Sequence, residues 1–325
     1  MGRILTFNCH EAYIHLLGKL GSDLDVVDGL PGRYCSGWDA RMRPVPACVR
    51  LISLETALGG QSYDAAIAHN LSDLLLLRAL DLPKILVLHV SLDARRTEEK
   101  GAPPLAAMQE QLATYLRAIS GIAVAVSRMK AASWGQDCLI IRPGIDPLEY
   151  QSFDGQEAVA LRVANQVLAR PLRFAWDAHT RITRGHALRL VGHNPGLAGS
   201  EAAASWQALR ACYQSHRAYV HTAGAGLDDG YNLAVVEAMM TGMPIVSLAG
   251  SESPVVDTVN GYVSDDPEVL NARLGQLLRD VAQARELGCR ARETALRDFS
   301  LPAFVAGWGA ALERARRTWL ASRRQ

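Results

Sequence analysis

Two acidic residues in the stretch DDGYNLAVVEAMMTGMPIVS (228–247) are spaced so that both could take part in ligand binding or catalysis. Asp229 lies just before an expected helix that begins near Gly230, and Glu237 lies about two turns inside that helix. A glycine-rich loop that leads into a helix directs backbone N–H groups and the positive end of the helix dipole toward an anion. Residues 230–233 are therefore a candidate phosphate site, although Asp229 alone could simply cap the helix.

Glu237 is unusual because the helix around it is otherwise apolar from 233 to 240. Burying a carboxylate is costly unless it is paired or bound. A ribose would satisfy it, since two neighbouring sugar hydroxyls can both donate to one carboxylate. The alternative is that Glu237 points to solvent from a single polar face, and the residues alone do not decide between the two.

The elements that must position these residues follow from the hydrophobic pattern of the first half of the chain. Apolar runs of β-forming residues alternate there with runs of helical periodicity. The expected strands are 3–8, 24–29, 63–69, 83–91, 121–127 and 138–146, and the expected helices are 11–21, 71–82 and 104–120. Strands that alternate with helices predict a parallel sheet with helices on both faces.

A polar, turn-rich stretch near 146–158 is interpreted as a linker, and the alternation resumes after it. The expected strands are 160–166, 187–194, 218–223, 243–250 and 261–266, followed by amphipathic helices over 267–298 and 302–323. We therefore expect an α/β protein with two Rossmann-like doubly wound domains, 1–150 and 151–301, that face each other across a cleft. Ligands of such domains bind at the carboxyl ends of the strands.

Composition excludes several classes of protein. The chain has 325 residues, 49% of them hydrophobic, and a formal net charge of +1, so nucleic acid is not an expected partner. A nicotinamide fingerprint of the form G-x-G-x-x-G is missing after the strands, which argues against a dehydrogenase. The six cysteines show no metal-ligand spacing and are interpreted as reduced thiols.

Neither a signal peptide nor an apolar run long enough to span a membrane is seen, so we expect a cytoplasmic protein. The basic end of the chain, ERARRTWLASRRQ, is interpreted as a solvated helical tail or as a possible peripheral membrane or partner contact.

Residues 229–246 resemble the donor motif of the family-4 retaining glycosyltransferases (glycosyl transferases group 1), which have the two-domain GT-B fold. The match covers the two acidic residues with seven residues between them, Gly230, the sequence EAM from Glu237 and the sequence GMP from Gly242. Asp229 departs from the family's glutamate, and Asn232 replaces a usual glycine. The segments IRPGIDPLEY, VSLAGSESPVVD and SPVVDTVNGYV are also similar to family segments, so the resemblance extends over most of the chain.

The resemblance implies roles for the motif itself. Asp229 would hold hydroxyls of the donor sugar and Glu237 the ribose. The start of the helix, Gly230, Tyr231, Asn232 and Leu233, would bind the donor diphosphate. The final helix, 302–325, would cross back onto the N-terminal domain.

The resemblance also implies a cationic clamp on the diphosphate. In VANQVLARP, Asn165 stands at the family's arginine position and Arg170 at its lysine position. Arg170 can still bind phosphate through two parallel hydrogen bonds, although an exposed loop arginine is an equal alternative. His193 and Asn194, in the strand-end loop LVGHNPGL, would lie near the nucleotide base and diphosphate.

Four residues of the N-terminal half follow expected strands and are candidates on the acceptor side. His89 ends the strand ILVLHVS and resembles the family's active-site histidine, which would hydrogen-bond the transferred sugar. His10 and Glu11 follow the first strand in NCHEAY, and His69 follows the strand AIAHN. Each histidine could instead be a satisfied core residue.

The sequence therefore predicts an enzyme that transfers a sugar from a nucleotide diphosphate sugar to a hydroxyl acceptor (a glycan, lipid or small molecule), with retained configuration. His89, Asp229 and Glu237 would be its catalytic residues. No metal and no other cofactor is expected. Two alternatives remain: a sugar-nucleotide epimerase on the same fold, which would need no acceptor, and a non-catalytic relative that binds nucleotide sugars.

Overall fold

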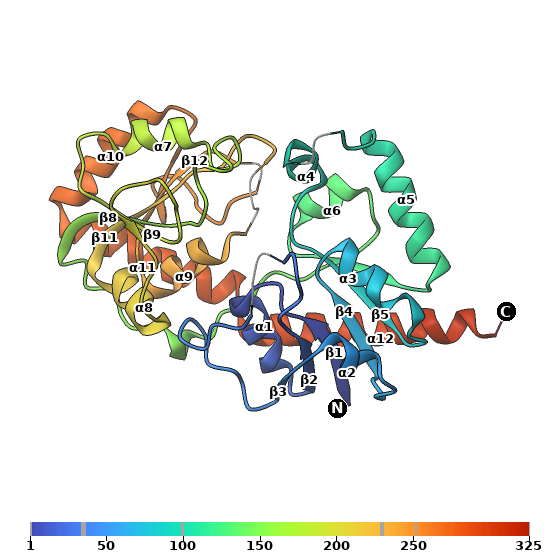
Figure 1. Ribbon diagram of the computed structural model, residues 1–325. Helices are drawn as coiled ribbons and strands as arrows, with labels where there is room; N and C mark the ends of the chain where they lie inside the picture. The colour runs from blue at the N-terminus through green and yellow to red at the C-terminus, as the bar shows by residue number, and fades with distance from the viewer. Residues whose placement is uncertain (1, 34–36, 99–100, 228–230, 251, 325) are drawn as a thin grey trace. The chain divides into compact units, whose positions relative to one another are not determined.

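The structure is a computed structural model that describes residues 2–33, 37–98, 101–227, 231–250 and 252–324 (Figure 1). The chain forms two compact units. Unit 1 consists of Met1–Leu92, Glu99–Gly144 and Pro302–Gln325, and unit 2 of Asp93–Glu98 and Ile145–Leu301. The last helix therefore belongs to the same unit as the N-terminal strands.

Unit 1 is built on a seven-stranded sheet of order β3-β2-β1-β4-β5-β6-β7. Its strands are β1 (Arg3–Phe7), β2 (Asp23–Val27), β3 (Val49–Ile52), β4 (Ala65–Ala68), β5 (Lys84–Leu88), β6 (Ile122–Ala125) and β7 (Leu139–Ile140). Its helices are α1 (Glu11–Leu17), α2 (Leu54–Leu58), α3 (Leu71–Leu76), α5 (Leu105–Ala118), α6 (Arg128–Trp134) and α12 (Leu301–Ser322), with 3-10 turns η1 (Gly18–Leu20) and η2 (Leu77–Ala79). All strand pairs are parallel, as the alternating pattern predicts.

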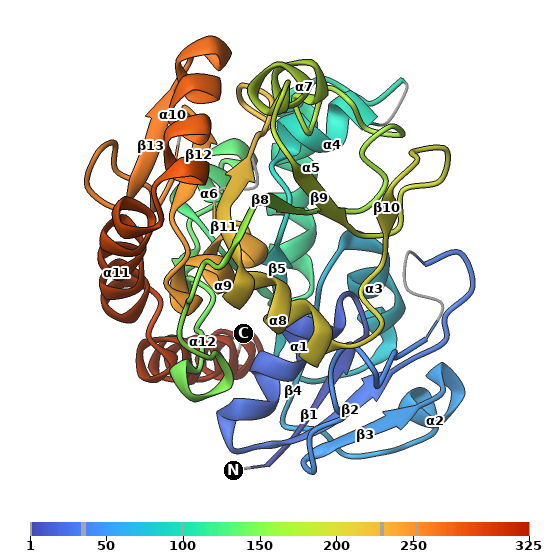
Figure 2. The ribbon, with the colours of Figure 1, turned by 90° about the vertical axis from the view of Figure 1, so that its left-hand side faces the viewer.

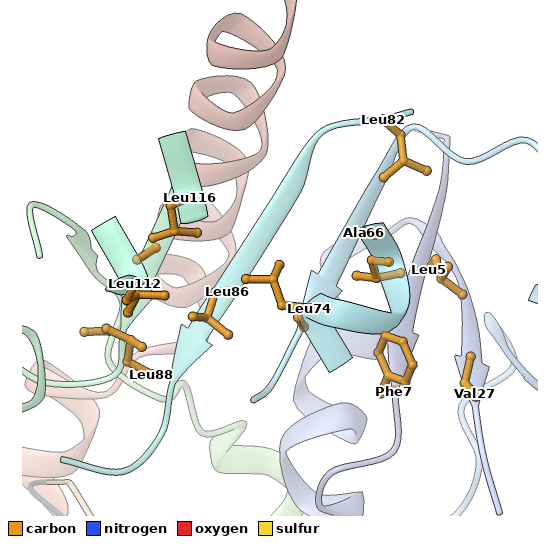
Figure 3. Packing of buried hydrophobic residues seen from close by; sticks show 14 of the residues in the cluster. Leu5, Phe7, Val27, Ala66, Leu74, Leu82, Leu86, Leu88, Leu112 and Leu116 are labelled. Carbon is orange, nitrogen blue, oxygen red and sulfur yellow. The ribbon is translucent and has the colours of Figure 1, made fainter. Parts of the chain in front are cut away.

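One face of this sheet is covered by α3 and α5, as Figure 3 shows. Leu86 and Leu88 of β5 share that face because side chains alternate along a strand, and Leu112 of α5 packs in the same cluster. Burying one such leucine contributes about 1.5–3 kcal/mol. The shared core fixes the strand ends from which the candidate residues project.

Helices α1 and α12 lie outside that cluster and contact each other. The ring of Tyr13 in α1 packs edge-on against Phe304 in α12, with 6.2 Å between the ring centroids. Farther along α12, Arg314 pairs with Asp137 of unit 1 at 3.0 Å. The C-terminal helix is thus tied to unit 1 by an aromatic contact and an ion pair.

Unit 2 is built on a six-stranded parallel sheet of order β10-β9-β8-β11-β12-β13. Its strands are β8 (Glu157–Val163), β9 (Leu188–Val191), β10 (Ser200–Glu201), β11 (His216–His221), β12 (Ile245–Leu248) and β13 (Gly261–Ser264). Its helices are α7 (Trp176–Thr183), α8 (Trp206–Ser215), α9 (Leu233–Thr241), α10 (Pro267–Arg279) and α11 (Val281–Asp298), with the 3-10 turn η3 (Pro147–Glu149); α4 (Leu92–Glu98) also falls almost wholly in this unit.

Helices α7, α10 and α11 cover one face of the second sheet. Figures 1 and 2 both show α7 beside α10, and Ile182 of α7 shares a core cluster with Leu274 of α10 and Val246 of β12. The expected helix over 267–298 is two helices, because Asp280 ends α10 and its side chain caps α11 by accepting from the Gln283 amide. Each sheet with its helices is a Rossmann-like layer arrangement, as predicted.

Helix α9 is buried along almost its whole length, from Val235 to Thr241. Side chains satisfy both of its ends: Asn232 caps the first turn, and Arg292 of α11 donates to the Met240 carbonyl. Gly242 ends the helix in the left-handed region, at φ 97°. An all-round apolar helix needs this enclosure, since it has no face suited to water.

No helix in the described part of the chain is both long enough and apolar enough to cross a membrane. The five described cysteines form no disulfide, and Cys35 lies outside the described residues.

Candidate functional site

The N-terminus of α9 differs in detail from the expectation. The helix begins at Leu233 rather than near Gly230, and its N-cap is Asn232. The Asn232 side-chain oxygen accepts from the amides of Ala234 at 2.9 Å and Val235 at 3.3 Å. The expected helix start near Gly230 is therefore wrong, because Asn232 caps a first turn that begins at Leu233; the phosphate-binding role of residues 230–233 stays a prediction.

Two of the predicted residues, Asp229 and Gly230, lie outside the described residues. Tyr231 is buried against Phe299, with the rings edge-on and 5.1 Å between centroids. The N-cap position of α9 is occupied by Asn232. The side chain of Leu233 is partly buried at the helix start.

Glu237 is buried, with 5% of its surface exposed. The interpretation that it points to solvent is therefore wrong. The hydroxyl of Tyr213 in α8 donates to its Oε2 at 3.1 Å, and Tyr213 is itself fully buried. A carboxylate on an apolar helix is held here by a tyrosine that the sequence pattern did not single out.

A hollow opens at the carboxyl ends of β11 and β12, beside the first turn of α9. It holds about 350 Å³ of empty space, part of it open to solvent. Its lining includes His221 at the end of β11, Val235 of α9, Ser247 of β12 and Glu252 in the following loop. His221 and Glu252 were not among the predicted site residues; the available signal was their position at or after the end of an apolar strand.

The loops after β8 and β9 are joined by three of the predicted donor residues. The Asn165 side chain accepts from the His193 amide at 2.7 Å. Buried Asn194 accepts from the Val167 amide at 3.0 Å and donates to the Ala164 carbonyl at 2.9 Å. The structure therefore brings Asn165, His193 and Asn194 together, with both asparagine side chains bonded to the backbone and the His193 side chain exposed.

Glycines allow these loops to approach closely. Gly192 has φ 148°, and a Cβ there would lie 2.0 Å from the Ala164 carbonyl oxygen. Gly224, in the loop after β11, donates its amide to the Arg173 carbonyl at 2.9 Å. A third loop is thus fixed to the loop after β8.

Buried Arg162 of β8 is hydrogen-bonded to the start of the loop after β11. Its guanidinium donates to the Thr222 hydroxyl at 2.8 Å and to the Thr222 carbonyl at 2.9 Å. Arg170 is only partly buried and donates to the Gln166 side chain at 3.2 Å. Arg170 therefore lies in the loop that Asn194 organises, at the carboxyl edge of the sheet.

In unit 1, His69 and His89 follow neighbouring strands β4 and β5 and meet at their carboxyl ends. His69 Nδ1 lies 2.9 Å from His89 Nε2, and the edge of Tyr13 packs against both rings. His69 is buried, and its backbone amide donates to the Asp73 carboxylate at 3.0 Å.

The hydrogen bonds assign the tautomers of this pair. The Thr6 hydroxyl donates its single proton to the Ile67 carbonyl at 3.1 Å. With that proton directed to the carbonyl, the same oxygen, 2.9 Å from His69 Nε2, accepts, and this network assigns the His69 proton to Nε2. Its Nδ1 then accepts from His89 Nε2–H, which leaves the Nδ1 lone pair of His89 as a hydrogen-bond acceptor.

Both histidines are neutral at physiological pH. Burial lowers the pKa of His69 to about 3. Burial, with His69 and Lys130 nearby, lowers the pKa of His89 well below its usual value. A neutral His89 whose Nδ1 accepts suits a sugar hydroxyl better than it suits a phosphate, which needs donors.

The remaining acceptor-side candidates lie at the same edge of the sheet. His10 is exposed and is the N-cap residue of α1, and Glu11 opens the helix and accepts from the Asp39 amide at 3.3 Å. Cys9, beside them, has its sulfur within 4.8 Å of ring nitrogens of His69 and His89. The structure therefore brings Cys9 and the two histidines together, and sequence analysis did not select Cys9.

Comparison with protein-family models found no match, and comparison with curated proteins found none either. Solved structures do match. Sucrose-phosphate synthase from Thermosynechococcus elongatus has 14% identity and a TM-score of 0.71, over 97% of this chain and 99% of that one. HepE from Anabaena, solved with UDP-glucose, has 14% identity and a TM-score of 0.72, over 96% of this chain and 99% of that one.

A glycosyltransferase from Rickettsia africae has 9% identity and a TM-score of 0.64, over 96% of this chain and 98% of that one. At such identities a structural match shows the fold alone. The two parallel sheets of seven and six strands, each with flanking helices, agree with it. The chain therefore has the GT-B fold of two Rossmann-like domains.

Proposed function

We propose that this chain is a retaining glycosyltransferase that moves a sugar from a nucleotide diphosphate sugar to a hydroxyl acceptor. The observation that carries the proposal is Glu237, a buried carboxylate in an otherwise apolar helix at the position where the donor motif has its second acid. A structural role needs no charge in such a helix, because an apolar side chain would pack there at lower cost. A ligand whose hydroxyl groups donate hydrogen bonds to the Glu237 carboxylate would explain why a charge is kept there.

The donor would bind unit 2 at the carboxyl edge of its sheet. Asn165, Arg170, His193 and Asn194 lie in the loops that follow β8 and β9 at this edge. Arg170 and the positive end of the α9 dipole would balance the diphosphate charge, with Asp229 on the sugar. HepE, which has the same fold, was solved with UDP-glucose, which makes UDP the first nucleotide to test.

The test is a thermal-shift panel of UDP, GDP, TDP, ADP and CMP, each with and without magnesium. A nucleotide at 100 times its dissociation constant adds about 2.7 kcal/mol to the stability of the state that binds it. One diphosphate clearly ahead supports the proposal and selects the sugars for an acceptor search. A flat response to all five contradicts it and favours a protein without a donor site.

Replacing Glu237 by glutamine is expected to weaken nucleotide binding without unfolding the protein. The amide oxygen still accepts from Tyr213, but the charge-assisted hydrogen bonds to ribose, about 1.5–3 kcal/mol, are lost. Affinity should fall about 10- to 100-fold, which reduces a stabilisation of about 2.7 kcal/mol to about 0.4–1.4 kcal/mol at the same nucleotide concentration.

Tyr213→Phe is the matched control for this prediction. It keeps the carboxylate and removes only the hydroxyl that donates to it. Nucleotide stabilisation should be retained in this variant, and equal stabilisation of the E237Q variant and the wild type would contradict a ribose role for Glu237.

His89→Ala is expected to lower turnover more than donor binding. The predicted contact of His89 is with the transferred sugar, whereas the nucleotide is assigned to unit 2. Turnover with an identified acceptor and nucleotide-dependent thermal shift should be measured on the same sample. A variant that no longer folds would instead show that His89 is a core residue whose partner is His69.

A further inference from the structure

Three metal-ligating side chains converge at the carboxyl edge of the sheet of unit 1. Cys9 follows β1, His69 follows β4 and His89 follows β5, and these three strands are neighbours in the sheet. The Cys9 sulfur and one ring nitrogen of each histidine all lie within 4.8 Å of one another. The sheet order, rather than sequence spacing, places them together, which explains why no ligand motif is visible in the sequence.

The hydrogen bonds behind the cluster are those of a metal-binding histidine. A ligating histidine usually donates its second ring N–H to a fixed acceptor, and this bond sets the tautomer and the ring orientation. His69 has this arrangement: Nε2–H donates to Thr6, which is held in turn by the Ile67 carbonyl. The lone pair of His69 Nδ1 is therefore directed at His89 Nε2 and into the cluster.

We propose that Cys9, His69 and His89 form a transition-metal site of the Zn²⁺ class with one open coordination position. One thiolate and two imidazoles favour zinc over magnesium or calcium, which prefer oxygen ligands. Zinc–nitrogen bonds of about 2.0–2.1 Å in a tetrahedron place two nitrogens about 3.3 Å apart. The ring nitrogens, 2.9 Å apart, would have to open slightly, and the Cys9 sulfur, within 4.8 Å of them, would have to lie about 3.5 Å from each, as Zn–S bonds of about 2.3 Å require.

The protons balance when the metal binds. The Cys9 thiol loses its proton to solvent and becomes the thiolate ligand. The His89 proton moves from Nε2 to Nδ1, so that the Nε2 lone pair replaces the hydrogen bond to His69 as a bond to the metal. The fourth position takes water or a hydroxyl. This site goes beyond the proposed sugar transfer, which assigns no metal to the chain; in the metal-bound form His89 Nδ1–H would donate to a sugar hydroxyl, whereas in the metal-free form Nδ1 accepts from it.

The experiment is a titration of the full-length, chelator-treated protein with Co²⁺ alone and then with Zn²⁺, without nucleotide. Cobalt bound to a thiolate gives a sulfur-to-metal charge-transfer band, and tetrahedral cobalt gives strong visible bands. One equivalent of Co²⁺ should bind with both signatures, and one equivalent of Zn²⁺ should displace it. Because no nucleotide is present, this result and the nucleotide panel succeed or fail separately.

Two variants and one control locate the site. Cys9→Ser should abolish the charge-transfer band. Thr6→Val replaces a residue that is not a proposed metal ligand, and it should weaken the affinity for Co²⁺ about 10- to 100-fold because the hydrogen bond from His69 Nε2–H to Thr6 is lost. Cys48→Ser is the control, since Cys48 is a partly buried cysteine of the same unit whose sulfur donates to Gly18. Sub-stoichiometric binding by the folded wild type, or a charge-transfer band that survives Cys9→Ser, would overturn the proposal and leave a hydrogen-bonded histidine pair.

Discussion

Replacing Gly288 with alanine is expected to destabilise unit 2 by about 3 kcal/mol, the upper end of the usual cost of overpacking. Gly288 is a buried residue of α11, and a Cβ there would lie 1.9 Å from the Gly242 carbonyl oxygen and 2.9 Å from its carbonyl carbon. The obstacle is backbone at the end of α9, so no side chain can turn away. Relief requires α11 to move away from α9, which also displaces the Arg292 contact with Met240.

Urea unfolding followed by hydrogen exchange of peptides from each unit would measure this loss. Gly309→Ala is the matched control because Gly309 is an exposed residue of α12, and a Cβ added there would meet no described atom within 4 Å. That substitution should stabilise its helix by about 0.5–1 kcal/mol. Equal stabilities of G288A and the wild type would show that α9 and α11 tolerate a wider separation.

Lowering the pH from 7.5 to 5.5 is expected to destabilise both units through buried neutral histidines. Burial lowers the pKa of His69 in unit 1 to about 3, and burial, with Arg162 nearby, lowers that of His179 in unit 2 to about 2. The unfolded chain binds protons below about pH 6.5, whereas the folded chain does not until the lowered pKa is reached. Stability therefore falls as the pH falls, by about 1.4 kcal/mol per histidine between these two pH values.

His179→Phe should remove the His179 share of this acid sensitivity from unit 2, while buried His216, whose pKa burial also lowers, keeps its own share. The His179 ring stacks on Trp176 at 4.6 Å, and neither ring nitrogen has a hydrogen-bond partner among the described residues. Phenylalanine keeps the stacking and removes both buried polar atoms, so the variant should be at least as stable as the wild type at pH 7.5. Unit 1, which keeps His69, is the internal reference, and an unchanged pH response in unit 2 would exclude His179 as its source.

The hydrophobic pattern alone predicted the fold class correctly, because parallel strands that are buried on both faces appear in the sequence as continuous apolar runs. It failed for short elements: the four-residue edge strand β3 (Val49–Ile52), with two exposed positions, and the two-residue β10 (Ser200–Glu201) were not predicted, and neither were the helices α2, α4, α6, α7 and α8. The start of α9 was misplaced because Asn232 and Asp229 are both good N-cap residues, and only the backbone shows which one is used.

The candidate site was predictable only where the chemistry lies within one stretch of sequence. Glu237 was selected because a carboxylate interrupts an apolar helix. Its partner Tyr213 belongs to another helix, and Cys9 meets His69 and His89 only through the strand order. Such pairings depend on contacts between residues far apart in sequence, which periodicity does not encode.

The ties among the loops of unit 2 have a consequence for chimeras. Asn194 links the loops after β8 and β9 through backbone groups, and Gly224 links the loop after β11 to Arg173 in the same network. A single loop grafted from a protein of the same fold would lose partners on both sides and leave buried amides unsatisfied. Specificity is therefore transferable only as a cassette of all three loops, with Gly192 and Gly224 retained to let their backbones meet.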